Sequence, residues 1–206
     1  MYFTDRKDAG RQLAARLGTI PDAVVVGLPR GGVPVAAEVA RALGAPLDIC
    51  VVRKLGVPSQ PELGMGAIGE GGARVLNERV RQAAHVTNDQ LAEVERSERA
   101  ELARRAARYR GGRPPVDLRG RTVVVVDDGI ATGSTARAAC RIVRQRGAAR
   151  VVLATPVAPA GWREELGGEA DELVCVHEPR GFLAIGAFYA DFDQTTDAEV
   201  LDALLG

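Results

Sequence analysis

The sequence has few cysteines and none of the motifs in which cysteine is usually functional. Cys50, Cys140 and Cys175 each lie inside or beside an apolar run, and no Cys-x-x-Cys pair or histidine-rich cluster accompanies them. This spacing excludes a disulfide framework and the common kinds of structural zinc site. Because free cysteine is among the most buried residue types, we expect three buried, unreactive thiols.

The sequence also has no net charge, no long apolar run and almost no lysine. The 27 basic residues balance 27 acidic ones, and only Lys7 and Lys54 are lysines. Zero net charge argues against a generally basic nucleic-acid surface, and no segment reaches the roughly 20 apolar residues of a membrane span. The first eight residues contain no apolar signal region. We therefore expect no nucleic-acid partner, no membrane partner and a cytoplasmic location.

The sequence does contain enough apolar residues for a core. Its hydrophobic content of 46% is typical of a globular chain, and we expect one domain over residues 1–206. Short apolar runs predict β-strands at 23–27, 47–52, 121–126, 150–155 and 172–176. Helical patterns alternate with them at 4–17, 33–43, 87–110 and 134–146. This alternation predicts an α/β fold with a doubly wound, mostly parallel sheet flanked by helices, whose carboxyl-end loops share one rim.

The predicted helix at 87–110 is the longest and is dense in Glu and Arg. Pairs such as Glu95/Arg99 and Glu101/Arg105 have the i,i+4 spacing of ion pairs on a solvated helix face. A second interpretation, that this helix binds a partner, stays open.

Residues 123–135 combine four valines, two acids and a turn of small residues, in the order Val-Val-Val-Val-Asp-Asp-Gly-Ile-Ala-Thr-Gly-Ser-Thr. Open α/β sheets bind ligands outside the carboxyl ends of their strands. At that edge Asp127 and Asp128 can accept hydrogen bonds from paired hydroxyls. The amides and hydroxyls that follow, at the start of a helix, favour an anion. The pattern favours a sugar phosphate as the ligand, over an ordinary capped turn.

This segment closely resembles the signature with which type I phosphoribosyltransferases bind phosphoribosyl diphosphate (PRPP). The resemblance implies that Asp127 and Asp128 hold the ribose 2′- and 3′-hydroxyls, and it makes both acids candidate metal ligands. It also implies that the 5′-phosphate is bound by Ala131, Thr132, Gly133, Ser134 and Thr135. The chain contains neither a Gly-Lys-Ser/Thr phosphate loop nor a Gly-x-Gly-x-x-Gly dinucleotide motif.

A second element, Gly-Leu-Pro-Arg-Gly-Gly-Val at 27–33, lies between a predicted strand and a helix. Its glycines allow backbone amides to face an anion, and Arg30 adds a guanidinium. A tight turn that simply requires two glycines is the alternative. The segment is similar to the diphosphate loop of the same family, which implies that Arg30, Gly31 and Gly32 bind diphosphate. That loop often contains a non-proline cis peptide, which a sequence cannot reveal.

A third element, Arg53-Lys54, follows the second predicted strand. Two cations at that rim can stabilise a departing diphosphate, with an exposed strand end as the alternative. The pair resembles the Arg-Lys that opens the mobile catalytic loop in adenine-type members of the family. Residues 56–72, with six glycines and two prolines, are predicted to form this loop, and 71–76 is a candidate hairpin arm. Glu62 and Glu70 are candidate loop acids, although solvated acids are the simpler interpretation.

In this family a hood built from the chain ends grips the nitrogenous base. Here the expected hood is residues 1–17 and 156–206, around a core at about 18–155. The segment containing Phe188, Tyr189 and Asp191 is similar to the aromatic-plus-aspartate segment that holds a purine, with one residue more between its glycine and aspartate. The alternative is that these aromatics pack the hood. Trp162 and His85 are expected to be structural, and His177 is a weaker candidate for base contact.

The resemblance implies a PRPP-dependent enzyme that transfers ribose 5-phosphate to a nitrogenous acceptor and releases diphosphate. The catalytic candidates are Arg53, Lys54, Asp127 and Asp128, and the segment at 188–191 favours a purine-like base. Mg²⁺ is expected to arrive with PRPP, held mainly by substrate oxygens. A regulator that senses PRPP or a nucleotide without turnover remains the alternative, whereas a PRPP-forming kinase would need an ATP site that is not evident. We expect a homodimer, although no residue specifies it.

Overall fold

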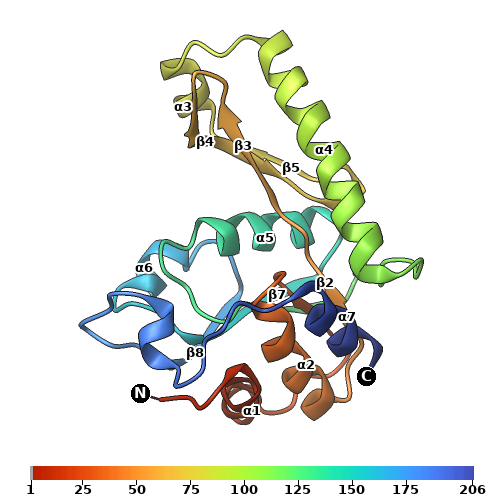
Figure 1. Cartoon of the computed structure of the whole chain (residues 1–206), viewed down its shortest axis with the longest axis vertical. Coiled ribbons are helices and arrows are strands. Elements are labelled where there is room, and N and C mark those ends of the chain that lie inside the picture. Colours follow the sequence, from red (N-terminus) through yellow and green to blue (C-terminus); the bar gives the residue numbers. More distant parts are fainter. Residues whose placement is uncertain (1) are drawn as a thin grey trace.

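The central element of the computed structural model, which describes residues 2–206, is a parallel five-stranded sheet (Figure 1). Its strands lie in the order β2-β1-β6-β7-β8, with bounds Leu47–Ile49, Ala23–Gly27, Thr122–Val126, Arg150–Val157 and Glu172–His177. Strands β1 and β6 are almost fully buried because helices cover both faces, as their unbroken apolar runs indicate. The predicted doubly wound α/β fold is confirmed.

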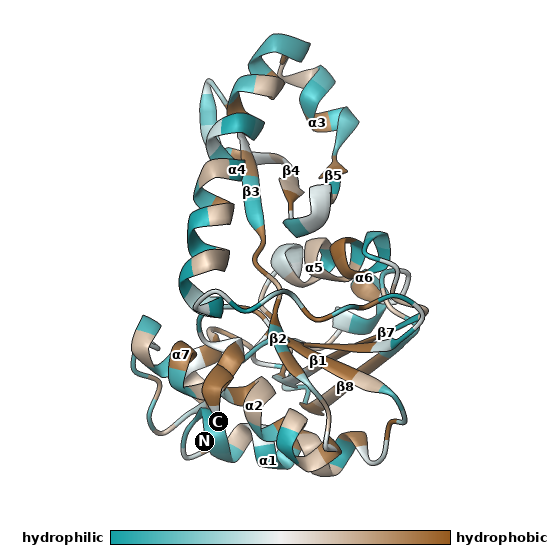
Figure 2. Ribbon diagram, turned by 90° about the vertical axis from the view of Figure 1, so that its right-hand side faces the viewer, coloured by the Kyte–Doolittle hydropathy of each residue, from teal (hydrophilic) through white to brown (hydrophobic). Residues whose placement is uncertain are grey.

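Helices cover the two faces of this sheet with separate apolar clusters. On one face lie α1 (Arg6–Leu17) and α2 (Gly32–Leu43), packed on Val25, Val124 and Val152. On the other face α5 (Ser134–Gln145) and α6 (Trp162–Leu166) pack on the alternate valines of the same strands. A final helix, α7 (Asp197–Leu205), packs against α2 and against the long helix α4 (Asn88–Arg110). Figure 2 shows hydrophobic residues concentrated in the sheet and in α2.

A second sheet projects from the core and was not predicted. Strands β3 (Arg53–Val57), β4 (Gln60–Ile68) and β5 (Arg74–Leu76) form an antiparallel sheet, followed by the short helix α3 (Glu78–Ala83). With α4 (Asn88–Arg110) they make up residues 53–110, which we call the arm (Figure 1). The expected hairpin arm at 71–76 corresponds to β5 and its preceding turn η1 (Glu70–Gly72).

The prediction of an irregular loop at 56–72 was therefore wrong in structure, since most of it is strand. Two of its glycines, Gly56 and Gly66, permit close contacts between strands. A Cβ at Gly56 would lie 2.4 Å from the Pro61 carbonyl oxygen, and one at Gly66 would lie 2.3 Å from that of Val75. The pairing register also shifts around Gly56, as at a β-bulge.

Helix α4 has the boundaries and the charge pattern that its sequence predicts. Thr87 and Gln90 form a capping box at its start, and Gly111 ends it in the left-handed conformation. One side packs on the arm sheet through Leu91, Leu102 and other apolar residues. The rest is mostly hydrophilic (Figure 2) and carries intrahelical ion pairs such as Glu101–Arg105 at 2.7 Å.

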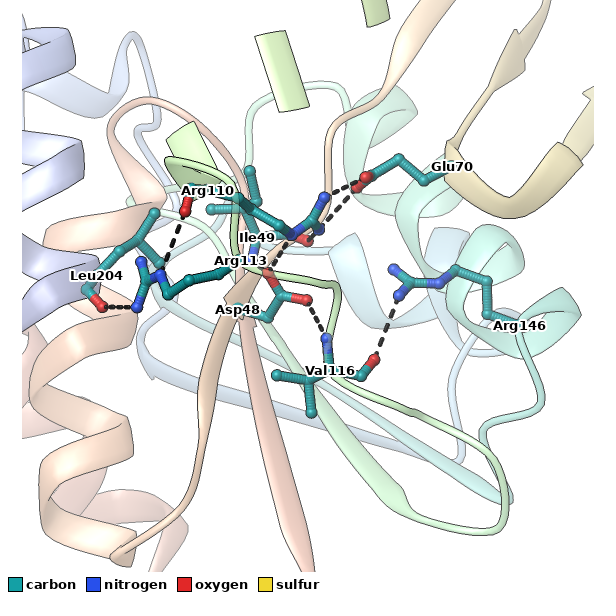
Figure 3. A network of polar contacts seen from close by, with 8 residues as sticks. All are labelled: Asp48, Ile49, Glu70, Arg110, Arg113, Val116, Arg146 and Leu204. Carbon is teal, nitrogen blue, oxygen red and sulfur yellow. Dashed lines mark hydrogen bonds and ion pairs between the residues drawn. The ribbon is translucent and has the colours of Figure 1, made fainter. Parts of the chain in front are cut away.

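A buried ionic network joins the arm to the core (Figure 3). Arg110, at the end of α4, donates to Asp48 Oδ1 at 2.9 Å and also binds Glu70. Asp48 Oδ2 accepts a hydrogen bond of 2.9 Å from the Val116 amide. Glu70 is thus a partly buried partner of Arg110 and not a solvated loop acid.

The N-terminal residues 2–4 and the segment 185–191 meet beside Val157 at the end of β7, within the regions expected to form the hood. Phe3 bridges to Tyr189, and the Ala190 amide donates to the Phe3 carbonyl at 2.8 Å. The turn η2 (Ile185–Phe188) completes an aromatic cluster at this point.

The three cysteines are buried as expected, and burial raises the pKa of each thiol to about 12. Among residues 2–206, no helix combines the length and the apolar character needed to cross a bilayer.

Candidate functional site

Two loops meet at the carboxyl ends of the neighbouring strands β1 and β6. The strands are in register, with Gly27 opposite Val126, so the loops that follow them lie side by side. A Cβ on Gly31 would lie 2.1 Å from Asp128 Oδ2, and one on Gly32 would lie 2.7 Å from the Val126 carbonyl oxygen. Only glycine permits this approach, which explains the Gly-Gly pair better than turn conformation does.

Arg30 precedes these glycines, and the peptide bond between Pro29 and Arg30 is cis. Its guanidinium extends toward Asp197 at the start of α7, at 4.0 Å, and its side chain remains 39% exposed. Gly31 is the N-cap of α2 and Gly32 its first residue, so both lie at a helix N-terminus, where the Gly32 amide donates to the Leu28 carbonyl at 3.0 Å.

The acid pair lies at the end of β6 in a largely buried setting. Asp128 is 9% exposed, and its amide donates to Asp127 Oδ1 at 2.9 Å. Burial raises the pKa of both carboxyls, and the charge of Asp128 raises the pKa of Asp127 further. The carboxylate oxygens of this pair can accept hydrogen bonds from a diol. Keeping both carboxyls ionised in this buried setting costs free energy.

Arg6, from the first turn of α1, is the residue that sequence reasoning missed at this site. Its Nε donates to Asp128 Oδ2 at 2.9 Å, and its Nη1 donates to the Asp193 carbonyl at 2.7 Å. The guanidinium lies 4.1 Å from the centre of the Phe192 ring. Its place in the expected hood was the only available signal, because a contact across 122 residues leaves no trace in local spacing.

The three residues expected to contact a base occupy different environments. Tyr189 is buried, and its hydroxyl donates to the Asp128 carbonyl at 2.6 Å. Phe188 is buried between Tyr2 and Phe182, with ring centroids at 5.6 and 5.4 Å. In this conformation both rings pack the hood, as the alternative interpretation states. Asp191 alone is exposed, beside a recess of about 330 Å³ that Arg6 also lines.

The two histidines and the tryptophan lie outside the two loops and have structural surroundings. His177 stacks on Tyr2 with centroids 4.1 Å apart, and burial lowers its pKa. Trp162 is buried in the core cluster beneath α5. His85 follows α3 with a positive φ of 53°.

The small-residue turn after the acids leads directly into α5. Gly133 adopts φ 75° at the helix start, where only glycine is favoured. Ala131, Thr132, Ser134 and Thr135 are exposed, and the hydroxyls of Thr132 and Ser134 are 3.1 Å apart. Exposed hydroxyls and a helix N-terminus together suit a phosphate group.

Arg53 and Lys54 were predicted at the end of the second strand of the central sheet, and this position was wrong. Three residues separate them from β2, and they begin β3 of the arm. Arg53 forms an ion pair of 2.6 Å with Glu98 of α4, and Lys54 Nζ donates to the Glu62 carbonyl at 2.9 Å. Lys54 nevertheless lines the same cleft as Ser134, a space of about 500 Å³ between the arm and α5.

Comparison with known proteins places this geometry in a family. The model of the phosphoribosyl transferase domain matches residues 7–177, which include both loops and the arm. The chain belongs to the phosphoribosyl transferase family. Proteins of two Mycobacterium tuberculosis strains, each named "Putative phosphoribosyl transferase", are 55% identical over 201 residues. The match covers 97% of this chain and 45% of theirs, so the chain spans about half the length of these relatives.

Two further similarities concern a solved structure and a shorter segment of this phosphoribosyl transferase domain. The crystal structure of the protein TT1426 from Thermus thermophilus has a TM-score of 0.88 at 46% identity, covering 100% of this chain and 98% of that one. An adenine phosphoribosyltransferase of Kineococcus radiotolerans is 52% identical over 50 residues, 23% of this chain and 27% of that protein.

The carboxylates of this phosphoribosyl transferase domain fit a metal ion only as minor ligands. Within residues 2–206 no group of three or more His, Cys, Asp or Glu side chains is arranged to hold a metal. Asp127 and Asp128 offer hard oxygen donors at the rim, which suits Mg²⁺ that keeps most of its other ligands from substrate and water.

Proposed function

We propose that the chain binds PRPP at the carboxyl ends of β1 and β6 and transfers its ribose 5-phosphate to a nitrogenous acceptor. The observation that carries this proposal is the contact between the Gly31–Gly32 turn and the acid pair. It brings a diol acceptor and an anion-binding helix start within one ligand's length. The phosphoribosyl transferase domain supports the same reaction class.

Each part of PRPP has a proposed binding partner. Asp127 and Asp128 accept hydrogen bonds from the ribose 2′- and 3′-hydroxyls. Residues 131–135 bind the 5′-phosphate through amides and hydroxyls at the start of α5, and residues 30–32 bind the diphosphate through their backbone at the start of α2, since the Arg30 guanidinium extends toward Asp197. Mg²⁺ would be held mainly by diphosphate oxygens and would neutralise part of their charge.

In the proposed reaction the bond from C1 of the ribose to the diphosphate oxygen breaks, and the electron pair leaves with diphosphate. A nitrogen of the acceptor forms the new bond to C1 and then loses its proton. Positive charge develops at C1 and negative charge on the diphosphate, so fixed charges can supply much of the acceleration. Of the three residues expected to contact a base, Asp191 is the exposed one, and its carboxylate can accept from an N–H group of a purine-like or similarly amino-bearing base.

Lys54 and Arg53 are proposed to stabilise the departing diphosphate after the arm has moved. Here Lys54 is held by the Glu62 carbonyl and Arg53 by Glu98. The β3–β4 hairpin would have to shift so that Lys54 reaches the donor site, by which we mean the proposed PRPP site at the ends of β1 and β6. Such a movement is the role expected of the mobile segment at 56–72.

The same contacts also favour a second candidate, a sensor of PRPP or of a nucleotide that has no turnover. Arg53 is already paired with Glu98, so a protein that only binds ligand would need no rearrangement of the arm.

One assay tests both candidates. The protein is incubated with PRPP, Mg²⁺ and a panel of nitrogenous bases, and diphosphate release is followed for wild type and for Asp127→Asn/Asp128→Asn. The control variant, Asp89→Asn/Asp117→Asn, removes two exposed acids outside the site. Release that depends on the base and on the acid pair supports the enzyme. Binding of PRPP without release on any base supports the sensor, and absence of PRPP binding rejects both.

A further inference from the structure

Four arginines converge on a small recess between α4, α7 and the loop after β1. Arg30, Arg104, Arg105 and Arg108 line it together with Tyr109 and Asp197, around a space of about 210 Å³. We call this the arginine recess. Since arginine is this chain's usual cation, the residue type alone says little. The informative feature is that two successive turns of α4 and a separate loop converge on one space.

Charge in the arginine recess is not balanced. Asp197 is the one carboxylate among its lining residues in the described part of the chain. Glu101 lies alongside and binds Arg104 at 2.7 Å and Arg105 at 2.7 Å. Four guanidiniums therefore face two carboxylates. On the earlier turns of the same helix Arg96 pairs with Glu93, and Glu95 is shared between Arg74 at 2.9 Å and Arg99 at 4.0 Å.

Asp197 already occupies the position that an external anion would take. Its Oδ2 lies 2.8 Å from Arg108, and its Oδ1 accepts from the Tyr109 hydroxyl at 2.9 Å. Arg30 approaches the same carboxylate only to 4.0 Å. The Asp197 carboxylate thus shows that the recess can hold anionic oxygen. A single carboxylate cannot accept from all the N–H donors of four guanidiniums.

Arg30 connects the arginine recess with the acid-pair site. The next two residues, Gly31 and Gly32, contact the acids after β6, while the Arg30 side chain points into the recess. An anion in the recess would therefore lie beside the loop proposed to bind diphosphate. Phosphate groups match several guanidiniums better than a carboxylate does, since each offers three oxygens to fork-shaped donors.

We propose that the arginine recess is a second anion site, which binds an oligophosphate of about the size of diphosphate next to the donor site. Asp197 screens the recess when it is empty and shares Arg108 and Tyr109 with the ligand when it is occupied. Binding at this site does not require turnover, so it does not depend on the proposed function.

The test is calorimetric titration of sodium diphosphate at about 0.15 M salt, where weak surface attraction is largely screened. The probe variant is Arg104→Gln/Arg108→Gln, and the control is Arg96→Gln/Arg99→Gln on the same helix. We expect the probe variant to lose one bound diphosphate per chain relative to wild type, or to bind it about tenfold more weakly. The control should match wild type.

A second variant guards against a trivial loss through misfolding. Asp197→Asn removes the competing charge while its amide oxygen can still accept from Tyr109, so diphosphate should bind more tightly, by about tenfold. Unchanged binding in both Arg104→Gln/Arg108→Gln and Asp197→Asn would overturn the proposal. If PRPP fails to bind wild type while the diphosphate results hold, the proposed function falls and the second anion site stands.

Discussion

Arg6 Nε donates to Asp128 Oδ2 at 2.9 Å, so a residue near one chain end holds an acid at the centre of the sheet rim. Tyr189, from the other chain end, donates to the backbone carbonyl of the same aspartate at 2.6 Å. The hood thereby fixes Asp128 from both its side chain and its backbone. Any movement of the hood would change the position of this carboxylate.

Arg6→Gln is expected to weaken PRPP binding about tenfold, because it leaves a mostly buried carboxylate without its charged partner. Arg6→Lys should recover part of the affinity by restoring the charge without the guanidinium fork. Calorimetry with PRPP and Mg²⁺ measures both. Arg11→Gln, on the same helix but 60% exposed, is the control and should bind as wild type does. Equal affinity in Arg6→Gln and Arg11→Gln would contradict this prediction.

Asp127→Asn is expected to stabilise the protein at pH 7 while it weakens PRPP binding. Burial and Asp128 raise the pKa of Asp127 in the folded state above that in the unfolded chain, which is about 3.9. Between these two pKa values the folded state binds more protons, so its stability falls as pH rises. Because asparagine does not ionise, the stability of Asp127→Asn does not fall with rising pH in this way.

The free energy of unfolding from urea titrations at pH 4 and pH 7 checks this. The advantage of Asp127→Asn over wild type should be small at pH 4 and larger at pH 7. The control, Asp89→Asn, replaces an exposed acid for which this cause is absent. An advantage that shrinks toward pH 7 would show that the sign is wrong.

Gly31→Ala tests the close approach of the two loops. Gly31 has φ −61°, which alanine adopts freely, so the effect is purely steric. The added Cβ would lie 2.1 Å from Asp128 Oδ2 and must displace the carboxylate or the turn. Overpacking of this kind costs about 1–3 kcal/mol, and PRPP affinity should fall by about 10- to 100-fold. Gly181→Ala meets no atom within 4 Å and should bind PRPP normally.

Lys54→Ala should lower kcat far more than it raises KM for PRPP. If Lys54 reaches the diphosphate only during transfer, its removal costs about 100-fold or more in kcat and leaves substrate affinity nearly unchanged. Steady-state kinetics on the acceptor found in the base panel measures the two parameters separately. Arg119→Ala, which removes an exposed cation outside the site, provides the control. A change in KM alone would assign Lys54 to ground-state binding.

Arg110→Ala should destabilise the whole chain, because it leaves the buried Asp48 and the partly buried Glu70 without their cation. Breaking a buried pair in this way costs about 3–5 kcal/mol. The Arg110 side chain is 7% exposed, against 80% for Arg119, which pairs with Asp117 on the surface. Urea titration should therefore separate Arg110→Ala from Arg119→Ala, whose stability should equal that of wild type.

The arm shows why part of the fold could not be predicted from the sequence. Gly56 and Gly66 resemble loop glycines, since a one-dimensional pattern does not distinguish flexibility from close contact with a neighbouring strand. The paired strands show that these two glycines serve close contact, because a Cβ on them would meet the carbonyl oxygens of Pro61 and Val75. The same limitation misplaced Arg53-Lys54, because the turn from the central sheet into the arm depends on contacts with α4.

Local sequence patterns were enough to predict the central sheet, the flanking helices α1, α2 and α5, and the two loops at the rim of the sheet. Those features follow from local patterns, in which apolar runs form strands, glycines end helices, and acids or small residues follow a strand. Tertiary structure alone decided that Arg6 holds Asp128, that Phe188 and Tyr189 pack inside the hood, and that Arg30 joins the arginines of α4. These contacts join residues far apart in the chain, and their energies depend on burial and distance, which local spacing does not encode.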